Sequence, residues 1–127
     1  MVTGFDHVHI FCGDMEKAKR FFEDSFGGKE VFRGETRGYP MIKVAVTGGI
    51  TVNIFGVDSK KAQLEAGKGN RGLDHVGFKA TDLERTVEDM KKKGVKVTIP
   101  PTVSPTTGTK YAFIEGPDGI VIELVEK

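Results

Sequence analysis

The sequence predicts an α+β fold made of two βαβββ modules that arose by internal duplication and form an open, curved mixed sheet. The first observation is a repeat, because residues 5–10 (FDHVHI) return as 73–78 (LDHVGF) after a shift of 68 positions. The second is a pair of β-rich runs, 50–55 (ITVNIF) and 120–125 (IVIELV), related by a shift of 70. A sequence repeat fixes the architecture, and two copies indicate a duplicated half-domain and not a solenoid.

The length of 127 residues suits a single domain with one core. We expect one domain over 1–127, with module one at about 1–57 and module two at about 73–127. The stretch between them, about 58–72, is polar and carries three glycines, so it is expected to connect the halves. A helical turn is expected near 62–66.

Composition argues against several classes of function. The chain is 38% hydrophobic and 29% charged with a net charge of +1, and no basic block suggests a nucleic-acid surface. No run of 18 apolar residues predicts a membrane span, and no signal-peptide pattern opens the chain. The single cysteine, Cys12, cannot form an internal disulfide and is expected to be a small core residue. A reducing, cytoplasmic location fits this cysteine usage.

Module one begins with a predicted strand at 5–12 and a helix at 15–26, where apolar residues recur at helical spacing after the N-cap Asp14. The remaining predicted elements of this half are strands and turns: strands at 29–33, 41–46 and 50–55, and turns at 35–39 and 47–49.

Module two repeats this plan. A strand is predicted at 73–80, and a helix follows Asp82 and stops at Gly94. The later strands of this half are predicted at 95–99, 110–115 and 120–125. Three prolines in the segment 100–109 predict an extended loop there, and this loop is a candidate lid over the site.

Four residues at matched positions of the repeat are candidate metal ligands. Strand alternation puts all of them on the sheet face away from the helices: His7, His75, Asn53 and Glu123. Glu123 stands in an otherwise apolar strand, where an unpaired carboxylate is costly. Two imidazoles and one carboxylate suit one divalent ion per site, Zn²⁺, Ni²⁺, Co²⁺, Mn²⁺ or Fe²⁺.

Two readings of these residues stay open from the pattern alone. Asn53 is either a weak fourth ligand through its carbonyl oxygen or a hydrogen-bond partner of a metal-bound water. The histidines and Glu123 are alternatively ordinary core and edge residues, but the duplication favours metal binding.

Other residues are candidates for catalysis or substrate binding. His9 lies two residues after His7 and shares its face, so it is either a general acid or base or only a lining residue. Cations and tyrosines that suit a substrate pocket, though each suits a solvated surface equally well, are Arg33, Arg37, Arg71, Lys110, Tyr39 and Tyr111.

The sequence resembles the vicinal oxygen chelate superfamily, the group of glyoxalase I, methylmalonyl-CoA epimerase, fosfomycin-resistance enzymes, extradiol dioxygenases and bleomycin-resistance proteins. The resemblance rests on the DHV strand with its Asp-capped helix, found twice, and on the closing run 113–124. The superfamily usually writes that run F-x-x-D-P-D-G-x-x-I-E-L, and this chain departs from it at Gly116, a loop position.

The resemblance implies paired βαβββ modules around a divalent metal held by His7, His75 and Glu123. Glyoxalase I has Glu at the Asn53 position, and epimerases commonly have Gln or Glu. Asn53 therefore leaves a set of two histidines and one carboxylate, which resembles that of iron dioxygenases and fosfomycin-resistance transferases. The resemblance also implies a homodimer whose sites are shared between subunits.

The leading functional prediction is a metal-dependent lyase or isomerase of glyoxalase or epimerase type. Such an enzyme chelates two neighbouring oxygens of a small carbonyl substrate and moves a proton, with Glu123 as the base. The alternatives are ring-cleaving dioxygenation, thiol addition to an antibiotic of the fosfomycin type, and metal-free ligand binding of the bleomycin-resistance kind.

Overall fold

A computed structural model describes residues 1–63, 68–69 and 71–127. The chain divides into two compact units, Met1–Ala62 and Gln63–Lys127, called here the first and the second unit. The boundary falls inside the predicted connection 58–72. The helical turn expected near 62–66 lies largely outside the described residues.

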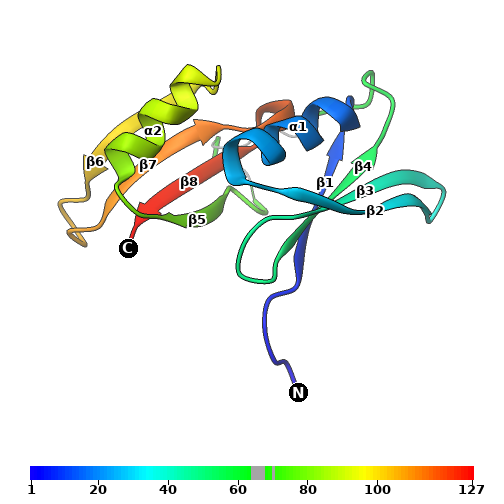
Figure 1. The fold of residues 1–127 in the computed structure, drawn as a ribbon, viewed down its shortest axis with the longest axis horizontal. Helices are drawn as coiled ribbons and strands as arrows, with labels where there is room; N and C mark the ends of the chain where they lie inside the picture. The colour runs from blue at the N-terminus through cyan, green and yellow to red at the C-terminus, as the bar shows by residue number, and fades with distance from the viewer. Residues whose placement is uncertain (64–67, 70) are drawn as a thin grey trace. The chain divides into compact units, whose positions relative to one another are not determined.

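The first unit is a four-stranded mixed sheet with one helix (Figure 1). Its elements are β1 (His7–Cys12), α1 (Met15–Phe26), β2 (Lys29–Thr36), β3 (Tyr39–Ala45) and β4 (Thr51–Gly56). The strand order is β1-β4-β3-β2, in which β1 runs parallel to β4 and the other pairs are antiparallel.

The second unit repeats this topology. Its elements are β5 (Val76–Ala80), α2 (Leu83–Lys92), β6 (Val97–Val103), β7 (Lys110–Glu115), a 3-10 turn (Pro117–Gly119) and β8 (Val121–Glu126). The order β5-β8-β7-β6, with β5 parallel to β8, matches the order in the first unit strand for strand. The predicted duplication of a βαβββ module is confirmed.

The register of the parallel strand pairs agrees with the repeat in the sequence. His9 lies beside Asn53 in the first unit, and Gly77 lies beside Glu123 in the second. Residues related by shifts of 68 and 70 therefore occupy equivalent places in their sheets.

Both helices begin at an aspartate that caps the first turn. Asp14 accepts a hydrogen bond from the Lys17 amide at 3.0 Å, and Asp82 accepts one from the Arg85 amide at 3.3 Å. These caps satisfy backbone donors that have no partner inside a helix. The predicted helix 15–26 is confirmed.

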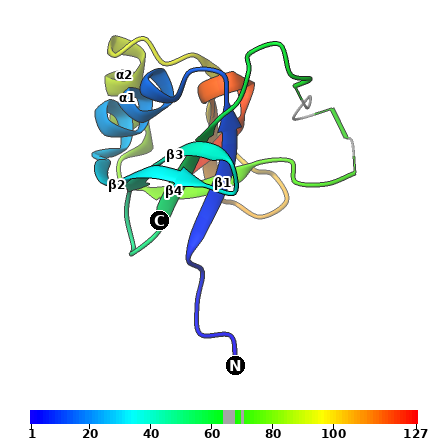
Figure 2. The ribbon, with the colours of Figure 1, turned by 90° about the vertical axis from the view of Figure 1, so that its right-hand side faces the viewer.

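Each helix buries its apolar stripe on one face of its own sheet, and Figure 2 shows the ribbon of α1 along one side of its sheet. In α1 the buried residues are Ala18 and Phe22, and in α2 they are Leu83, Val87 and Met90. The sheet residues beneath them are almost fully buried, namely Ile42, Val44, Val52 and Ile54 in the first unit and Ala112, Ile114, Ile122 and Leu124 in the second. Cys12 is also buried, as predicted.

Two turns differ from the sequence prediction. The turn expected at 35–39 is only two residues long, because β2 continues to Thr36 and β3 starts at Tyr39. Its central residues, Arg37 and Gly38, both have positive φ, at 51° and 82°. Two positive φ angles are the signature of a type I′ hairpin, whose twist matches the flanking strands.

The loop predicted from residue 100 is wrong, because β6 runs through Pro100 and Pro101 to Val103. Proline is tolerated here since β6 is an edge strand and its register with β7 shifts twice, between Val97 and Thr102. Only 104–109 remain as a connection, so the candidate lid is shorter than predicted.

The strand predicted at 73–80 starts three residues later, at Val76, so His75 precedes β5.

Across the described part of the chain, no helix is long and apolar enough to cross a membrane.

Candidate metal-binding site

His75 and Glu123 form a pair in the second unit. The Nε2 atom of His75 lies 3.1 Å from Oε2 of Glu123. His75 directly precedes β5, and Glu123 is on the neighbouring strand β8. The Phe113 ring packs edge-on against His75 with a centroid distance of 5.3 Å. Phe113 lies opposite Glu123 in the register, while its neighbour Ile114 is fully buried. The pair therefore lies on the sheet face away from α2, as predicted.

The other nitrogen of His75 is held by the preceding residue. Nδ1 lies 2.8 Å from Oδ2 of Asp74, and because a carboxylate only accepts, Nδ1 donates the proton. This carboxylate–histidine arrangement fixes the ring and directs Nε2 toward the site, as outer partners do for metal-binding histidines.

The two carboxylates change the protonation of His75. The hydrogen bond to Asp74 raises the pKa of His75 above 6.5, with a further contribution from Glu123, while partial burial acts in the opposite direction. In the metal-free protein a proton therefore occupies Nε2 more readily than in an isolated histidine.

His7 repeats this arrangement in the first unit. Its Nδ1 lies 2.6 Å from Oδ2 of Asp6, so Nε2 is again the free nitrogen. The side chain is 45% exposed, compared with 34% for His75. Both proposed histidine ligands thus carry a carboxylate on Nδ1, and the repeated Asp-His dipeptide was the sequence signal that could have identified Asp6 and Asp74.

Asn53 occupies the position equivalent to Glu123 but is engaged differently. It is 6% exposed, and its Oδ1 accepts a hydrogen bond of 3.0 Å from the Thr51 hydroxyl. One lone pair of Oδ1 is therefore in use, and the other is left for either of the two predicted roles, a weak ligand or a partner of a metal-bound water.

His9 belongs to an aromatic cluster, defined here as His9, Phe11, Tyr39 and Phe55. The His9 ring centroid lies 3.9 Å from that of Phe55 and 4.5 Å from that of Phe11. Tyr39 completes the cluster at 5.1 Å from Phe11 and 6.2 Å from Phe55. The structure thus places His9 and the predicted pocket residue Tyr39 together on the His7 face of the first sheet.

The Nε2 atom of His9 is buried and has no hydrogen-bond partner among the residues that the structure describes. Desolvation lowers the pKa of His9 below 6.5, and the nearby charges of Arg37 and His7 lower it further. His9 is accordingly neutral near pH 7, with a ring nitrogen available for a hydrogen bond.

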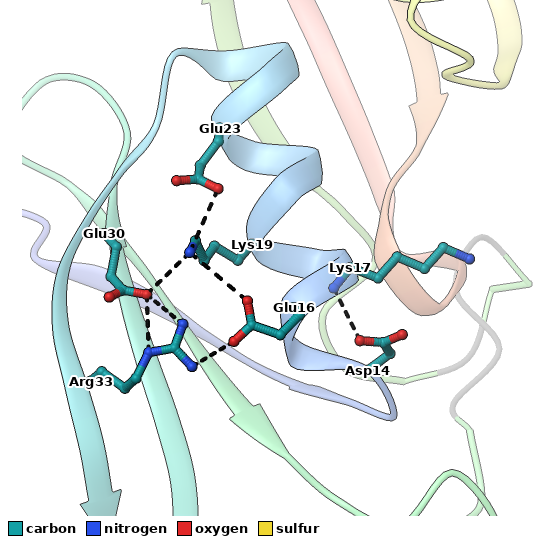
Figure 3. A network of polar contacts seen from close by, with 7 residues as sticks. All are labelled: Asp14, Glu16, Lys17, Lys19, Glu23, Glu30 and Arg33. Carbon is teal, nitrogen blue, oxygen red and sulfur yellow. Dashed lines mark hydrogen bonds and ion pairs between the residues drawn. The ribbon is translucent and has the colours of Figure 1, made fainter.

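Arg33 lies on the opposite side of its sheet. It pairs in register with the buried Ile42 on the helix-covered face, and its guanidinium bonds Glu16 of α1 at 2.5 Å and Glu30 at 2.6 Å. Figure 3 shows this network, which Lys19 and Glu23 extend along the helix. Arg33 therefore ties α1 to β2, and we leave it out of the site.

Lys110 is used in the same way in the second unit. Its Nζ lies 2.5 Å from the carboxylate of Glu84 on α2 and 3.6 Å from Glu126. It holds the helix to β7 and is also left out of the site. Tyr111 lies in register with Val125 and contacts Phe113 at 5.8 Å, so it lies on the Glu123 face.

A shallow groove of about 540 Å³ lies where α1 begins, lined by 13–16, Pro40 and 56–58. None of the proposed metal ligands lines it. The candidate metal site, with its histidines and carboxylate, is therefore separate from this groove.

Within the described ranges, no three side chains among His, Cys, Asp and Glu gather into a ready-made metal site. Each unit supplies two of the four predicted donors: His7 and Asn53 in the first, His75 and Glu123 in the second. The donor types suit a divalent transition metal, because both histidines present Nε2 with Nδ1 already bonded to carboxylate.

Comparison with known proteins gives relatives that match nearly all of this chain. YwkD of Bacillus subtilis (strain 168) is 28% identical over 133 residues, covering 100% of this chain and 99% of that protein. A probable chloroplastic lactoylglutathione lyase of Arabidopsis thaliana is 33% identical and covers 95% of this chain, but the chain spans only 35% of its length.

Solved structures have the same fold. The glyoxalase family protein from Enterococcus faecalis superposes with a TM-score of 0.84 at 22% identity, covering 97% of each chain. An E126Q mutant of the fosfomycin resistance protein FosX from Listeria monocytogenes superposes with a TM-score of 0.74 at 18% identity, covering 98% of this chain and 90% of FosX. That FosX structure is a complex with Mn(II) and 1S,2S-dihydroxypropylphosphonic acid.

The sequence profile of one family matches residues 4–124, nearly the whole chain. That match covers both DHV segments and ends at Leu124, the last residue of the closing run. Together with the duplicated βαβββ topology, it shows that the chain belongs to the Glyoxalase/Bleomycin resistance protein/Dioxygenase superfamily.

Proposed function

We propose that this protein is a divalent-metal-dependent enzyme that binds a small carbonyl substrate through two neighbouring oxygens and moves a proton beside the carbonyl. The reaction class is that of a lyase or isomerase. The observation that carries the proposal is the His75–Glu123 pair at 3.1 Å, backed by Asp74 on the far nitrogen of the imidazole.

The proposed ligands are the Nε2 atoms of His7 and His75 and the carboxylate of Glu123, with Asn53 as a weak fourth. A bound divalent ion supplies Lewis acidity that polarises a substrate carbonyl. Asp6 and Asp74 orient the imidazoles and keep their Nδ1 atoms protonated, so that Nε2 is the nitrogen offered to the ion.

Proton transfer is assigned to the chain's own side chains. Glu123 accepts the substrate proton, because it is the carboxylate on the open face of the second sheet that lies beside His75. His9 offers its unpartnered Nε2 as a hydrogen-bond acceptor, and the surrounding rings exclude water from it.

The relatives support this assignment. One relative is a probable lactoylglutathione lyase, and the FosX complex contains Mn(II), so lyase chemistry and divalent metals occur among proteins similar to this one. We further propose a homodimer in the cytoplasm, whose ligand pairs come from one chain or are shared between two.

A second candidate rests on Asn53. Its Oδ1 already accepts from Thr51, which leaves two histidines and one carboxylate as the strong donors. That set suits an iron-dependent dioxygenase with open coordination positions, or thiol addition to a fosfomycin-like substrate.

The test is a substrate panel on metal-reconstituted protein. The panel contains the thiohemiacetal of methylglyoxal, an epimerisable acyl-CoA, a catechol with oxygen, and fosfomycin with a thiol. Turnover of the first or second substrate, abolished in Glu123→Gln and retained in the matched surface variant Glu88→Gln, supports the proposal.

Oxygen-dependent cleavage of the catechol, or addition of the thiol to fosfomycin, would support the second candidate in its place. Failure to bind any divalent ion would reject both and leave metal-free ligand binding.

A further inference from the structure

Arg37 differs from Arg33 and Lys110 in having no carboxylate paired with it among the described residues. Among the described residues it forms no ion pair, whereas Arg33 and Lys110 each bond two carboxylates. Its guanidinium carbon lies 5.5 Å from the centroid of the Phe55 ring. The cation is therefore held over the aromatic cluster, on the His7 face of the first sheet.

The backbone at Arg37 is unusual for an arginine. It stands at the first central position of the β2–β3 turn with φ 51°, where Asn, Asp or Gly is preferred. A β-carbon is disfavoured in this left-handed region. The turn does not favour arginine at this position, so we attribute a role to the arginine side chain and not to the turn conformation.

The surroundings of Arg37 suit a ligand. Phe55 is buried, while Phe11 and Tyr39 are exposed large hydrophobic residues at its side. His9 packs its imidazole against the same rings. Together these groups offer one positive charge beside a flat apolar surface, and no carboxylate in the described part of the chain pairs with it.

We propose that Arg37 and the aromatic cluster form a binding subsite for an organic anion, a carboxylate attached to a flat or apolar body. The carboxylate pairs with the guanidinium, and the body of the ligand packs on Phe11 and Tyr39. As a statement about substrate class it rests on the proposed function, and it selects substrates that carry a carboxylate away from the reacting carbonyl.

The first experiment measures binding of benzoate and of its neutral isostere benzamide to the protein, by NMR with the Tyr39 ring resonance as reporter, because this residue of the aromatic cluster is retained in every variant. It is run with a chelator and again after metal reconstitution. Benzoate is expected to bind about tenfold more tightly than benzamide and to shift that resonance.

Two variants separate binding from folding. Arg37→Asn suits the turn and is expected to be at least as thermally stable as wild type, but to lose the preference for benzoate. Arg20→Ala removes a charge from the exposed side of α1 and is expected to change neither property.

Equal binding of benzoate and benzamide, or an unchanged preference in Arg37→Asn, would overturn the proposal. A clear loss of stability in Arg37→Asn would likewise overturn it, because it would make Arg37 a structural residue. The sample with chelator distinguishes failure of the subsite from failure of the proposed enzyme function. A preference for benzoate in the absence of metal supports the subsite even if the protein has no metal-dependent activity.

Discussion

Gly77 lies beside Glu123 in the parallel register of β5 and β8, at the position that His9 occupies beside Asn53 in the first unit. A β-carbon on Gly77 would lie 3.7 Å from Oε2 of Glu123, an ordinary contact. The missing side chain leaves the carboxylate free to reach His75. In the first unit the imidazole of His9 occupies the equivalent position. The two halves of the duplication have therefore diverged: the second unit has the His75–Glu123 pair, and the first has the aromatic cluster.

This relationship predicts opposite results for two substitutions at Gly77. Gly77→Ala is expected to retain metal affinity, because one methyl group fits beside Glu123. Gly77→Phe is expected to displace the carboxylate from His75 and to lower metal affinity by about tenfold or more. Isothermal titration with Mn²⁺ and Zn²⁺ measures both, and equal affinities would show that Glu123 does not depend on this space.

The raised pKa of His75 predicts how metal affinity varies with pH. A metal needs unprotonated Nε2, so affinity is expected to fall as the pH drops below a pKa that lies above 6.5. For the metal-free protein the sign is reversed: this group stabilises the fold fully below 6.5, and the contribution is lost as the pH rises through the folded-state pKa.

Asp74→Asn provides the control, because the Asp74 hydrogen bond is the largest cause of the shift. NMR titration of the His75 ring is expected to give a lower pKa in this variant than in wild type. An unchanged value would mean that Asp74 does not hold Nδ1 in solution.

His9→Phe separates pocket lining from ligation. Phe keeps the ring contacts to Phe55 and Phe11 and removes a buried nitrogen that has no partner, so thermal stability is expected to rise. Metal content is expected to stay at the wild-type level while turnover falls. Loss of metal in this variant would make His9 a ligand and contradict the assignment to His7.

Arg33→Ala tests the exclusion of Arg33 from the site. The ion pairs of Arg33 with Glu16 and Glu30 are solvent-exposed, so a small drop in melting temperature is expected, and it should shrink at high salt. Metal affinity and the Michaelis constant are expected to be unchanged. A raised Michaelis constant would return Arg33 to the substrate pocket.

The sequence pattern was sufficient for the fold because the signals were local and repeated. The structure has a strand at the first DHV segment. It also has both predicted helices, which are capped by Asp14 and Asp82 and bury their apolar stripes. The strand through Pro100 and Pro101 was missed because a proline is acceptable in an edge strand with shifted register, which no local rule reveals.

The site was predictable only in part, because ion pairing is a tertiary property. Nothing in the sequence distinguishes Arg33, which bonds Glu16 on α1 and Glu30 on its own strand, from Arg37, which bonds no carboxylate among the described residues. The carboxylates Asp6 and Asp74 stood next to the predicted histidines, yet only the geometry assigns them to Nδ1.

The central claim is that His7, His75 and Glu123 hold a divalent metal, and metal content tests it most directly. Inductively coupled plasma mass spectrometry is applied to untagged wild type, His75→Ala and the control His9→Phe. We expect about one divalent ion per chain in wild type and in His9→Phe, and a loss in His75→Ala. Wild-type protein that remains without metal after reconstitution with several divalent ions would contradict the claim.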